Sequence, residues 1–196
     1  DNKSIYFTSD REGGFGGKDI YVIRKLPNDK YSQPRLLDEN INTPFDEATP
    51  YMHPDGRTLF FSSKGHNTMG GYDIFYSRMN EDYKFEEPEN LGYPVNTAGD
   101  NVAYIMSLDG RSGYLSAYSE EGYGNLDIYE IKYKKSPIKG INLFIGDVKD
   151  SEEKVPDNVK IVARNVKTGE ISGIYRPDKN RGEYVIALPP GNEYEL

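Results

Sequence analysis

The sequence predicts an all-β protein in which part of a β-propeller is followed by a small β-sandwich. Three observations support this prediction. They are a sequence repeat of 54 residues, a chain rich in Tyr and Phe and frequently interrupted by Gly and Pro, and a change of pattern after Lys135. We therefore expect residues 1–135 to form propeller blades and residues 136–196 to form the sandwich.

The repeat is defined by columns of identical or similar residues. Asp-Ile followed by an aromatic residue occurs at 19–21, 73–75 and 127–129, a spacing of 54 residues. Asp-Gly-Arg at 55–57 returns at 109–111 on the same offset. A fixed period of roughly 20–50 residues, or slightly above, is typical of chains built from stacked copies of one supersecondary unit.

The middle copy predicts four short antiparallel strands, the number in a propeller blade. Their expected ranges are 47–53, 58–63, 73–79 and 85–91, separated by an Asp-Gly turn and by loops that contain Gly. Successive residues of a strand point to opposite faces, so the apolar pair Ile74 and Phe75 makes both faces of the third strand apolar. A blade packed between two others needs such a strand. Residues 1–135 hold about two and a half copies, so we expect further blades upstream.

The period stops after Lys135. Apolar stretches at 138–148, 158–164, 170–175 and 182–188 are divided by Asp, Asn, Gly and Pro. Short strands separated by such turns predict a small antiparallel β-sandwich, which we expect to continue beyond Leu196.

Composition excludes several classes of function. The formal net charge of −8 disfavours nucleic acid as a partner, because such proteins need a clustered basic face. The chain has no cysteine, which excludes disulfides, Cys-based zinc sites and a Cys nucleophile. No apolar run reaches the roughly 18 residues of a transmembrane helix. We expect no cofactor.

The repeated aspartates are the best candidates for a chemical site. In one interpretation, three carboxylates on equivalent strands, Asp19, Asp73 and Asp127, surround a common axis. The alternative is that each accepts hydrogen bonds from backbone N–H groups of its own Gly-rich loop. Repetition in every copy favours this structural role, because a propeller's site is usually built from residues that differ between blades.

Other motifs give weaker signals. The Gly-rich stretch 13–17 lacks the Lys-Ser/Thr of a phosphate-binding loop and leads into a strand. The only histidines, His53 and His66, lack a second His at metal-ligand spacing. The chain has no nucleophile elbow and no pair of carboxylates arranged for glycoside hydrolysis. We therefore predict no catalytic and no metal-binding residues.

Some segments resemble known families. Residues 5–11 (IYFTSDR), 54–63 (PDGRTLFFSS) and 70–75 (GGYDIF) resemble WD-like propeller repeats of the TolB type. Residues 169–191 resemble a carboxypeptidase regulatory-like β-sandwich. In this order, together with 90–97 (NLGYPVNT), the two domains resemble the middle of an OmpA-family envelope protein.

The resemblance implies a non-enzymatic protein-interaction scaffold, periplasmic and associated with the outer membrane, and that family includes components of type IX secretion. It implies other envelope proteins as partners, and peptidoglycan only through a domain that is not present in this chain. Loops carry binding on rigid scaffolds, so the candidate interaction loops are 11–18, 64–72 and 118–126. Four side chains are candidate contacts there: Phe15, His66, Tyr72 and Tyr123. The alternatives are packing of these rings between blades, a glycan-binding module, and the accessory propeller of a hydrolase.

Overall fold

The computed structural model describes residues 4–26, 30–80, 82–138 and 140–196, and these form an all-β fold without a helix. The predicted all-β class is thus confirmed. The chain divides into two compact units: unit 1 (Asp1–Ser107 and Arg111–Lys135) and unit 2 (Leu108–Gly110 and Ser136–Leu196). The main division, between Lys135 and Ser136, lies where the sequence repeat ends.

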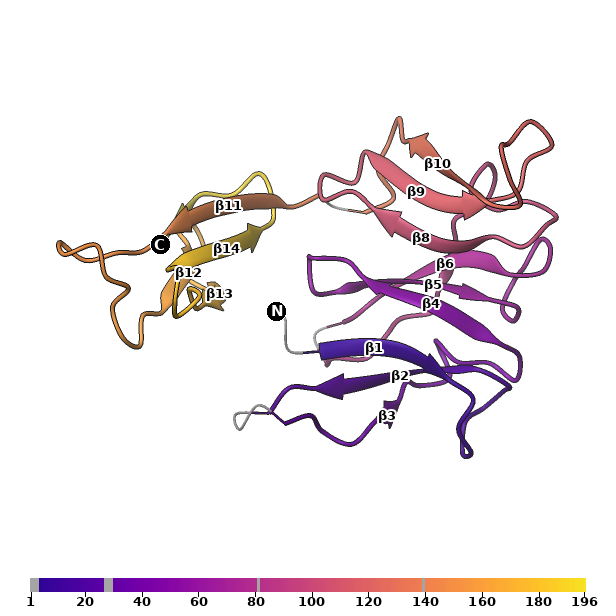
Figure 1. The fold of residues 1–196 in the computed structure, drawn as a ribbon, viewed down its shortest axis with the longest axis horizontal. Helices are drawn as coiled ribbons and strands as arrows, with labels where there is room; N and C mark the ends of the chain where they lie inside the picture. The colour runs from indigo at the N-terminus through magenta and orange to yellow at the C-terminus, as the bar shows by residue number, and fades with distance from the viewer. Residues whose placement is uncertain (1–3, 27–29, 81, 139) are drawn as a thin grey trace. The chain divides into compact units, whose positions relative to one another are not determined.

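Unit 1 contains three small antiparallel sheets, one for each copy of the repeat (Figure 1). Sheet 1 consists of β1 (Ser4–Ser9), β2 (Asp19–Arg24) and β3 (Arg35–Leu36). Sheet 2 consists of β4 (Glu47–Met52), β5 (Thr58–Ser63), β6 (Asp73–Arg78) and β7 (Glu89–Asn90). Sheet 3 consists of β8 (Val102–Met106), β9 (Ser112–Ala117) and β10 (Asp127–Lys132).

The expected four strands per copy occur only in sheet 2. The described part of sheet 1 begins with β1, which is the counterpart of β5 at the 54-residue offset. Sheet 3 has no counterpart of β7, because the equivalent residues, Leu143 and Phe144, belong to β11 (Asn142–Asp147) in unit 2. The fourth strand is also shorter than expected: β7 pairs with β6 only at Phe75–Asn90 and Tyr76–Glu89.

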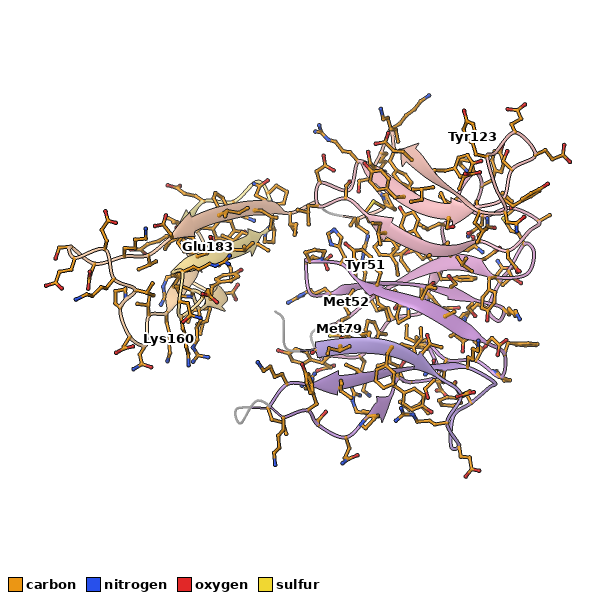
Figure 2. All side chains as sticks on the ribbon, viewed as in Figure 1. Tyr51, Met52, Met79, Tyr123, Lys160 and Glu183 are labelled. Atoms are coloured by element: carbon orange, nitrogen blue, oxygen red, sulfur yellow. The ribbon has the colours of Figure 1, made fainter. Side chains whose placement is uncertain are left out.

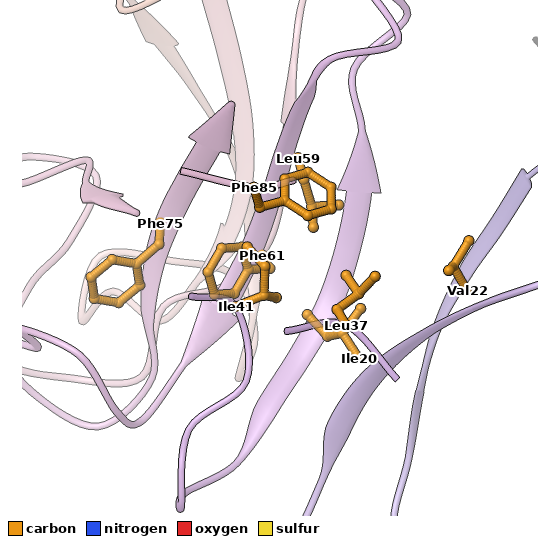
Figure 3. Packing of buried hydrophobic residues seen from close by; sticks show 8 residues of the cluster. All are labelled: Ile20, Val22, Leu37, Ile41, Leu59, Phe61, Phe75 and Phe85. Carbon is orange, nitrogen blue, oxygen red and sulfur yellow. The ribbon is translucent and has the colours of Figure 1, made fainter. Parts of the chain in front are cut away.

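The main core of unit 1 lies between sheets 1 and 2, where β4 contacts β1 and β2 (Figure 3). Three sources contribute to it: strands of sheet 1, strands of sheet 2 and the connecting segments. The eight buried members are Ile20, Val22, Leu37, Ile41, Leu59, Phe61, Phe75 and Phe85. Met52 and Met79, labelled in Figure 2, pack against this core from its margin.

Sheet 2 is buried on both faces. Leu59 and Phe61 of β5 face sheet 1, whereas Phe60 points the other way, and its ring centroid lies 5.2 Å from that of Tyr104 in β8. All six residues of β5 are buried as a result. The period-2 alternation of a strand thus explains why adjacent residues are both apolar in this column.

Unit 2 is built from two small sheets. One pairs β11 with β14 (Glu183–Leu188), and the other has the order β13 (Ile171–Tyr175), β12 (Ile161–Asn165), β15 (Tyr194–Glu195). Its core consists of Ala163, Ile186 and Leu188. The hydroxyl of Tyr175 donates a hydrogen bond of 2.8 Å to the carbonyl oxygen of Ala187, which ties β13 to β14.

Candidate functional site

The candidate site lies on the loops that join the second and third strands of each copy. These loops are β1–β2, β5–β6 and β9–β10, and Figure 1 shows them at the same edge of the three sheets of unit 1. One position in each loop, at the 54-residue offset, carries a large exposed apolar side chain. We call this set the apolar row: Phe15 (47% exposed), Met69 (53%) and the fully exposed Tyr123, labelled in Figure 2.

The repeated aspartates fix the backbone beneath the apolar row. The amide N–H of Phe15 donates to the Asp19 carboxylate at 3.1 Å, and that of Tyr123 donates to Asp127 at 2.9 Å. The N–H of Met69 donates to Asp73 at 2.6 Å in the same way. These are the contacts that a structural role for the aspartates requires. The aspartates therefore do not form a separate site, and they set where the row residues point.

The glycine before each row residue in two of the loops has a steric reason. A Cβ atom at Gly14 would collide with the Asp19 carboxylate, and one at Gly122 would collide with that of Asp127. The loop must pass this close to the carboxylate for its N–H groups to be bound. Glycine at this position thus lets the first and third loops approach the carboxylate closely, whereas the second loop has Thr68 there.

The first two loops are also joined to the following sheet. In the first loop, the N–H of Lys18 donates to Asp46 at 3.1 Å, and the carbonyl oxygen of Lys18 accepts the N–H of Glu47 at 2.7 Å. Both acceptor and donor come from the start of sheet 2. The loop that carries Phe15 is therefore held from both sides, by its own aspartate and by the next copy.

Tyr72 takes part in the equivalent junction between sheets 2 and 3. Its N–H donates to Asp100 at 2.9 Å, and its carbonyl oxygen accepts the N–H of Asn101 at 2.6 Å. The ammonium group of Lys64 lies 4.6 Å from the centre of the Tyr72 ring, a cation–π contact. Tyr72 is therefore partly covered, and it does not belong to the apolar row.

His66 packs on the sheet below it. Its ring centroid lies 5.2 Å from that of Phe75 and 5.9 Å from that of Phe61, and its Nε2 is 3.1 Å from the carbonyl oxygen of Ile41. Partial burial lowers the pKa of His66 below its ordinary value, although the hydrogen bond to Ile41 acts in the opposite direction. His66 therefore covers the edge of the core, whereas the row residues are exposed to solvent.

Sequence reasoning missed Met69. It selected aromatic residues and chose Tyr72 in the second loop, although the 54-residue offset from Phe15 and to Tyr123 leads to Met69. The periodicity that revealed the fold thus also contains the signal for the row.

One asparagine holds sheet 1 to its connecting segment, and a second asparagine does the same for sheet 2. Asn42 Oδ1 accepts the N–H of Ile20 at 2.7 Å, and its Nδ2 donates to the carbonyl oxygens of Ile20 and Leu37. Asn96 binds both backbone groups of Ile74 at 2.8 Å. We call this arrangement the asparagine clamp, and it occurs once between each pair of neighbouring sheets.

Glu47, a fully buried carboxylate of unit 1, is also satisfied within the fold. It accepts hydrogen bonds from the N–H and hydroxyl of Thr43 and from the hydroxyl of Ser63, at 2.6–2.9 Å. Burial raises its pKa above the ordinary value, and these hydrogen bonds only partly offset that effect. Glu47 therefore stabilises a turn and is not exposed to a substrate.

The Asp-Gly-Arg turn uses its carboxylate in the same way. Asp55 accepts the N–H groups of Arg57 and Thr58, both at 2.8 Å, and Gly56 has a φ of +70°, which suits glycine. Burial acts to raise the pKa of Asp55, but hydrogen bonds from His53, Thr58 and Arg57 outweigh it and lower the pKa.

Within the described ranges, no three His, Asp or Glu residues are grouped in a way that could hold a metal ion. The same ranges contain no helix with the length and apolar character needed to cross a membrane. No protein family model matches the chain, and no curated protein matches it significantly.

Proposed function

We propose that the chain is a non-enzymatic protein-interaction scaffold of the bacterial cell envelope, the periplasmic part of an outer-membrane-associated OmpA-family protein. In this proposal, sheets 1, 2 and 3 are consecutive blades of a β-propeller, and unit 2 is a carboxypeptidase regulatory-like β-sandwich. The envelope assignment rests on the sequence resemblance, and the interaction role rests on the apolar row.

The propeller proposal is supported by how the copies follow one another. Strand β4 contacts sheet 1, and β8 contacts β4, β5 and β6 of sheet 2. The same face of sheets 1 and 2 is thus covered by the first strand of the next copy. Repeated face-to-face contact between consecutive copies of one antiparallel sheet is typical of propeller blades.

The observation that carries the interaction role is the apolar row. Three large apolar side chains occupy one repeat position in three loops, and each is exposed to solvent. Hydrogen bonds to aspartate fix the backbone of each, so little conformational entropy is lost when a partner binds. Aromatic residues and Met are enriched at protein interfaces. A rigid row of this kind is suited to a protein partner.

The test is affinity capture from the native cell envelope with the 196-residue chain as bait. A triple variant that replaces the row (Phe15→Ser, Met69→Ser and Tyr123→Ser) should lose a defined set of envelope proteins that the natural chain retains. The matched control replaces three exposed aromatic residues outside the row: Tyr31→Ser, Phe45→Ser and Tyr83→Ser. The control should retain the same proteins as the natural chain.

Recovery of the same proteins with the row variant would contradict the interaction role, and a captured set that is not from the envelope would contradict the location. A parallel titration with peptidoglycan fragments and other oligosaccharides separates the glycan-binding alternative. Saturable glycan binding that disappears with the row variant would assign the row to a glycan. A serine-hydrolase domain in the same polypeptide would favour the accessory-propeller alternative.

A further inference from the structure

One sheet face is buried in two copies of the repeat and open in the third. Ile20 in β2 and Ile74 in β6 occupy the same column, and both are 0% exposed, whereas Ile128 in β10 is 82% exposed. Nothing in the strand itself accounts for the difference, because the Asp-Ile-aromatic sequence is the same in all three copies. The difference is that sheets 1 and 2 are each covered by a following copy.

The neighbours of Ile128 on this face show the same contrast. Tyr114 of β9 is 37% exposed, while Phe60 at the equivalent position of β5 is fully buried. Ile105 of β8 is also exposed. Glu130 adds a polar end to the face, where it accepts hydrogen bonds from the hydroxyls of Ser112 and Tyr114. We call the surface formed by Ile105, Tyr114, Ile128 and Glu130 the open face.

The edge of the same sheet is open as well. Strand β2 pairs with β3, and β6 pairs with β7, but among the described residues β10 pairs with β9 alone. In sheets 1 and 2 the asparagine clamp binds the backbone of the column isoleucine, through Asn42 and Asn96. In the described part of the chain, no asparagine takes this position against Ile128. Residue 150, at the next 54-residue offset, is an aspartate in unit 2.

The segments that follow β3 and β7 share one sequence pattern, and the structure shows what several of its residues contact. Residues 37–46 and 91–100 both have Leu, then Ile or Val four positions later, then Asn-Thr, then Asp three positions after Thr. The Ile or Val is buried, the Asn forms the clamp, and the Asp binds the loop N–H of the preceding copy. The pattern is Leu-x3-(Ile/Val)-Asn-Thr-x2-Asp.

We propose that the open face and the free edge of β10 are a docking site for a polypeptide segment that carries this pattern and that lies outside residues 1–196. The segment adds to β10 as a short antiparallel strand, as β3 and β7 do in their sheets. Its Asn then clamps Ile128, and its Asp binds the backbone N–H of Leu126. Strand addition at an exposed sheet edge is an established mode of peptide recognition. Both segments of this pattern within the chain are already bound in their own copies, so the occupant is a further one.

The inference rests on the geometry of sheets 1–3 and is independent of the proposed envelope function. The docking site meets the apolar row only in the β9–β10 loop, which holds both Leu126 and Tyr123, and the rest of it lies on the strands of sheet 3. The two proposals can therefore fail separately.

The test titrates the isotope-labelled 196-residue chain with a capped peptide that has the sequence of residues 89–101, and amide signals are followed by NMR. We expect saturable shifts centred on β10 and slower hydrogen exchange at the Ile128 amide. A peptide in which the residue corresponding to Asn96 is alanine should bind about tenfold more weakly, since the clamp contributes hydrogen bonds to two backbone groups. Ile128→Lys in the chain should abolish the shifts.

Ile145→Lys is the matched control, because Ile145 is a similarly exposed isoleucine in unit 2. Its chain should bind the peptide as the natural chain does. Three results would overturn the proposal: no shift at β10 at millimolar peptide, equal binding of the alanine peptide, or binding that Ile128→Lys leaves unchanged. Shifts at β10 that appear on concentrating the chain alone would assign the edge to a second copy, and would also overturn it.

Discussion

At the scale of single residues, the repeat uses carboxylates to build loops. Asp19, Asp73 and Asp127 each accept a backbone N–H from the residue four positions earlier, and that residue belongs to the apolar row. The aspartate is therefore the same in all three copies, whereas the residue whose backbone it binds differs: Phe, Met and Tyr. One loop conformation can thus present three different side chains to a partner.

Glu47 gives a pH-dependent prediction at this scale. Burial raises its pKa above the ordinary value of 4.5, so the folded state binds the proton more tightly than the unfolded chain does. This contribution to stability is complete below pH 4.5 and is lost as the pH rises through the folded pKa. In Glu47→Gln the side chain does not ionise, and its amide still hydrogen-bonds to the turn. The advantage of the natural chain over the variant should therefore shrink as the pH rises.

The measurement is the free energy of unfolding of unit 1 by urea at several pH values between 4 and 7, for both chains. Other carboxylates titrate equally in the two chains and cancel in the difference. A difference that is constant across this range, or that grows with pH, would contradict the prediction.

At the scale of elements, the strands buried on both faces were predictable, and the edge strands were not. The predicted range 58–63 is the observed β5, because both faces of that strand are apolar and a turn precedes it. The predicted range 85–91 shortened to β7 at Glu89–Asn90, with an isolated bridge between Met79 and Phe85. The side chain of Phe85 enters the core there, and alternating polarity in the sequence does not determine where an edge ladder breaks.

The candidate site was also predictable from the sequence only in part. The loops and the aspartate contacts followed from the repeat, since the offset and the Gly-rich turns are visible in the sequence. The partial covering of Tyr72 and His66 could not be predicted, because these residues are as polar and aromatic as many surface residues. Their contacts with Lys64 and with Phe75 are formed only in the folded sheet.

The asparagine clamp gives a prediction for an element junction. Asn96 is fully buried and binds both the N–H and the carbonyl oxygen of Ile74. Asn96→Ala should destabilise unit 1 by about 2–4 kcal/mol, because two buried backbone groups lose their partner. Asn125→Ala is the control, since Asn125 is an exposed asparagine in the β9–β10 loop.

Urea unfolding of the two variants measures this difference, and amide exchange at Ile74 localises it. A loss below about 0.5 kcal/mol for Asn96→Ala, or an unchanged exchange rate at Ile74, would mean that the clamp is not what holds sheet 2 to its connecting segment.

At the scale of the whole molecule, two kinds of β structure follow each other in one chain. In unit 1 the copies are interdependent, since β5 is buried only because sheets 1 and 3 cover its two faces. Stability in such repeats comes from each copy and from its interfaces with neighbours. In unit 2 a separate and smaller core joins its own two sheets.

Because each unit has its own core, a core substitution should act on one unit. Leu59 is fully buried between sheets 1 and 2, and Leu59→Ala should lower the stability of unit 1 by about 2–5 kcal/mol. Ile186 is fully buried in unit 2, and Ile186→Ala should lower the stability of that unit by a similar amount.

The measurement is hydrogen exchange of the most protected amides in β5 and in β14. Leu59→Ala should accelerate exchange in β5 and leave β14 unchanged, with the reverse for Ile186→Ala. Leu26→Ala, at an exposed position, is the control and should change neither. Equal acceleration in both strands by either core variant would show that the two cores unfold as one cooperative system.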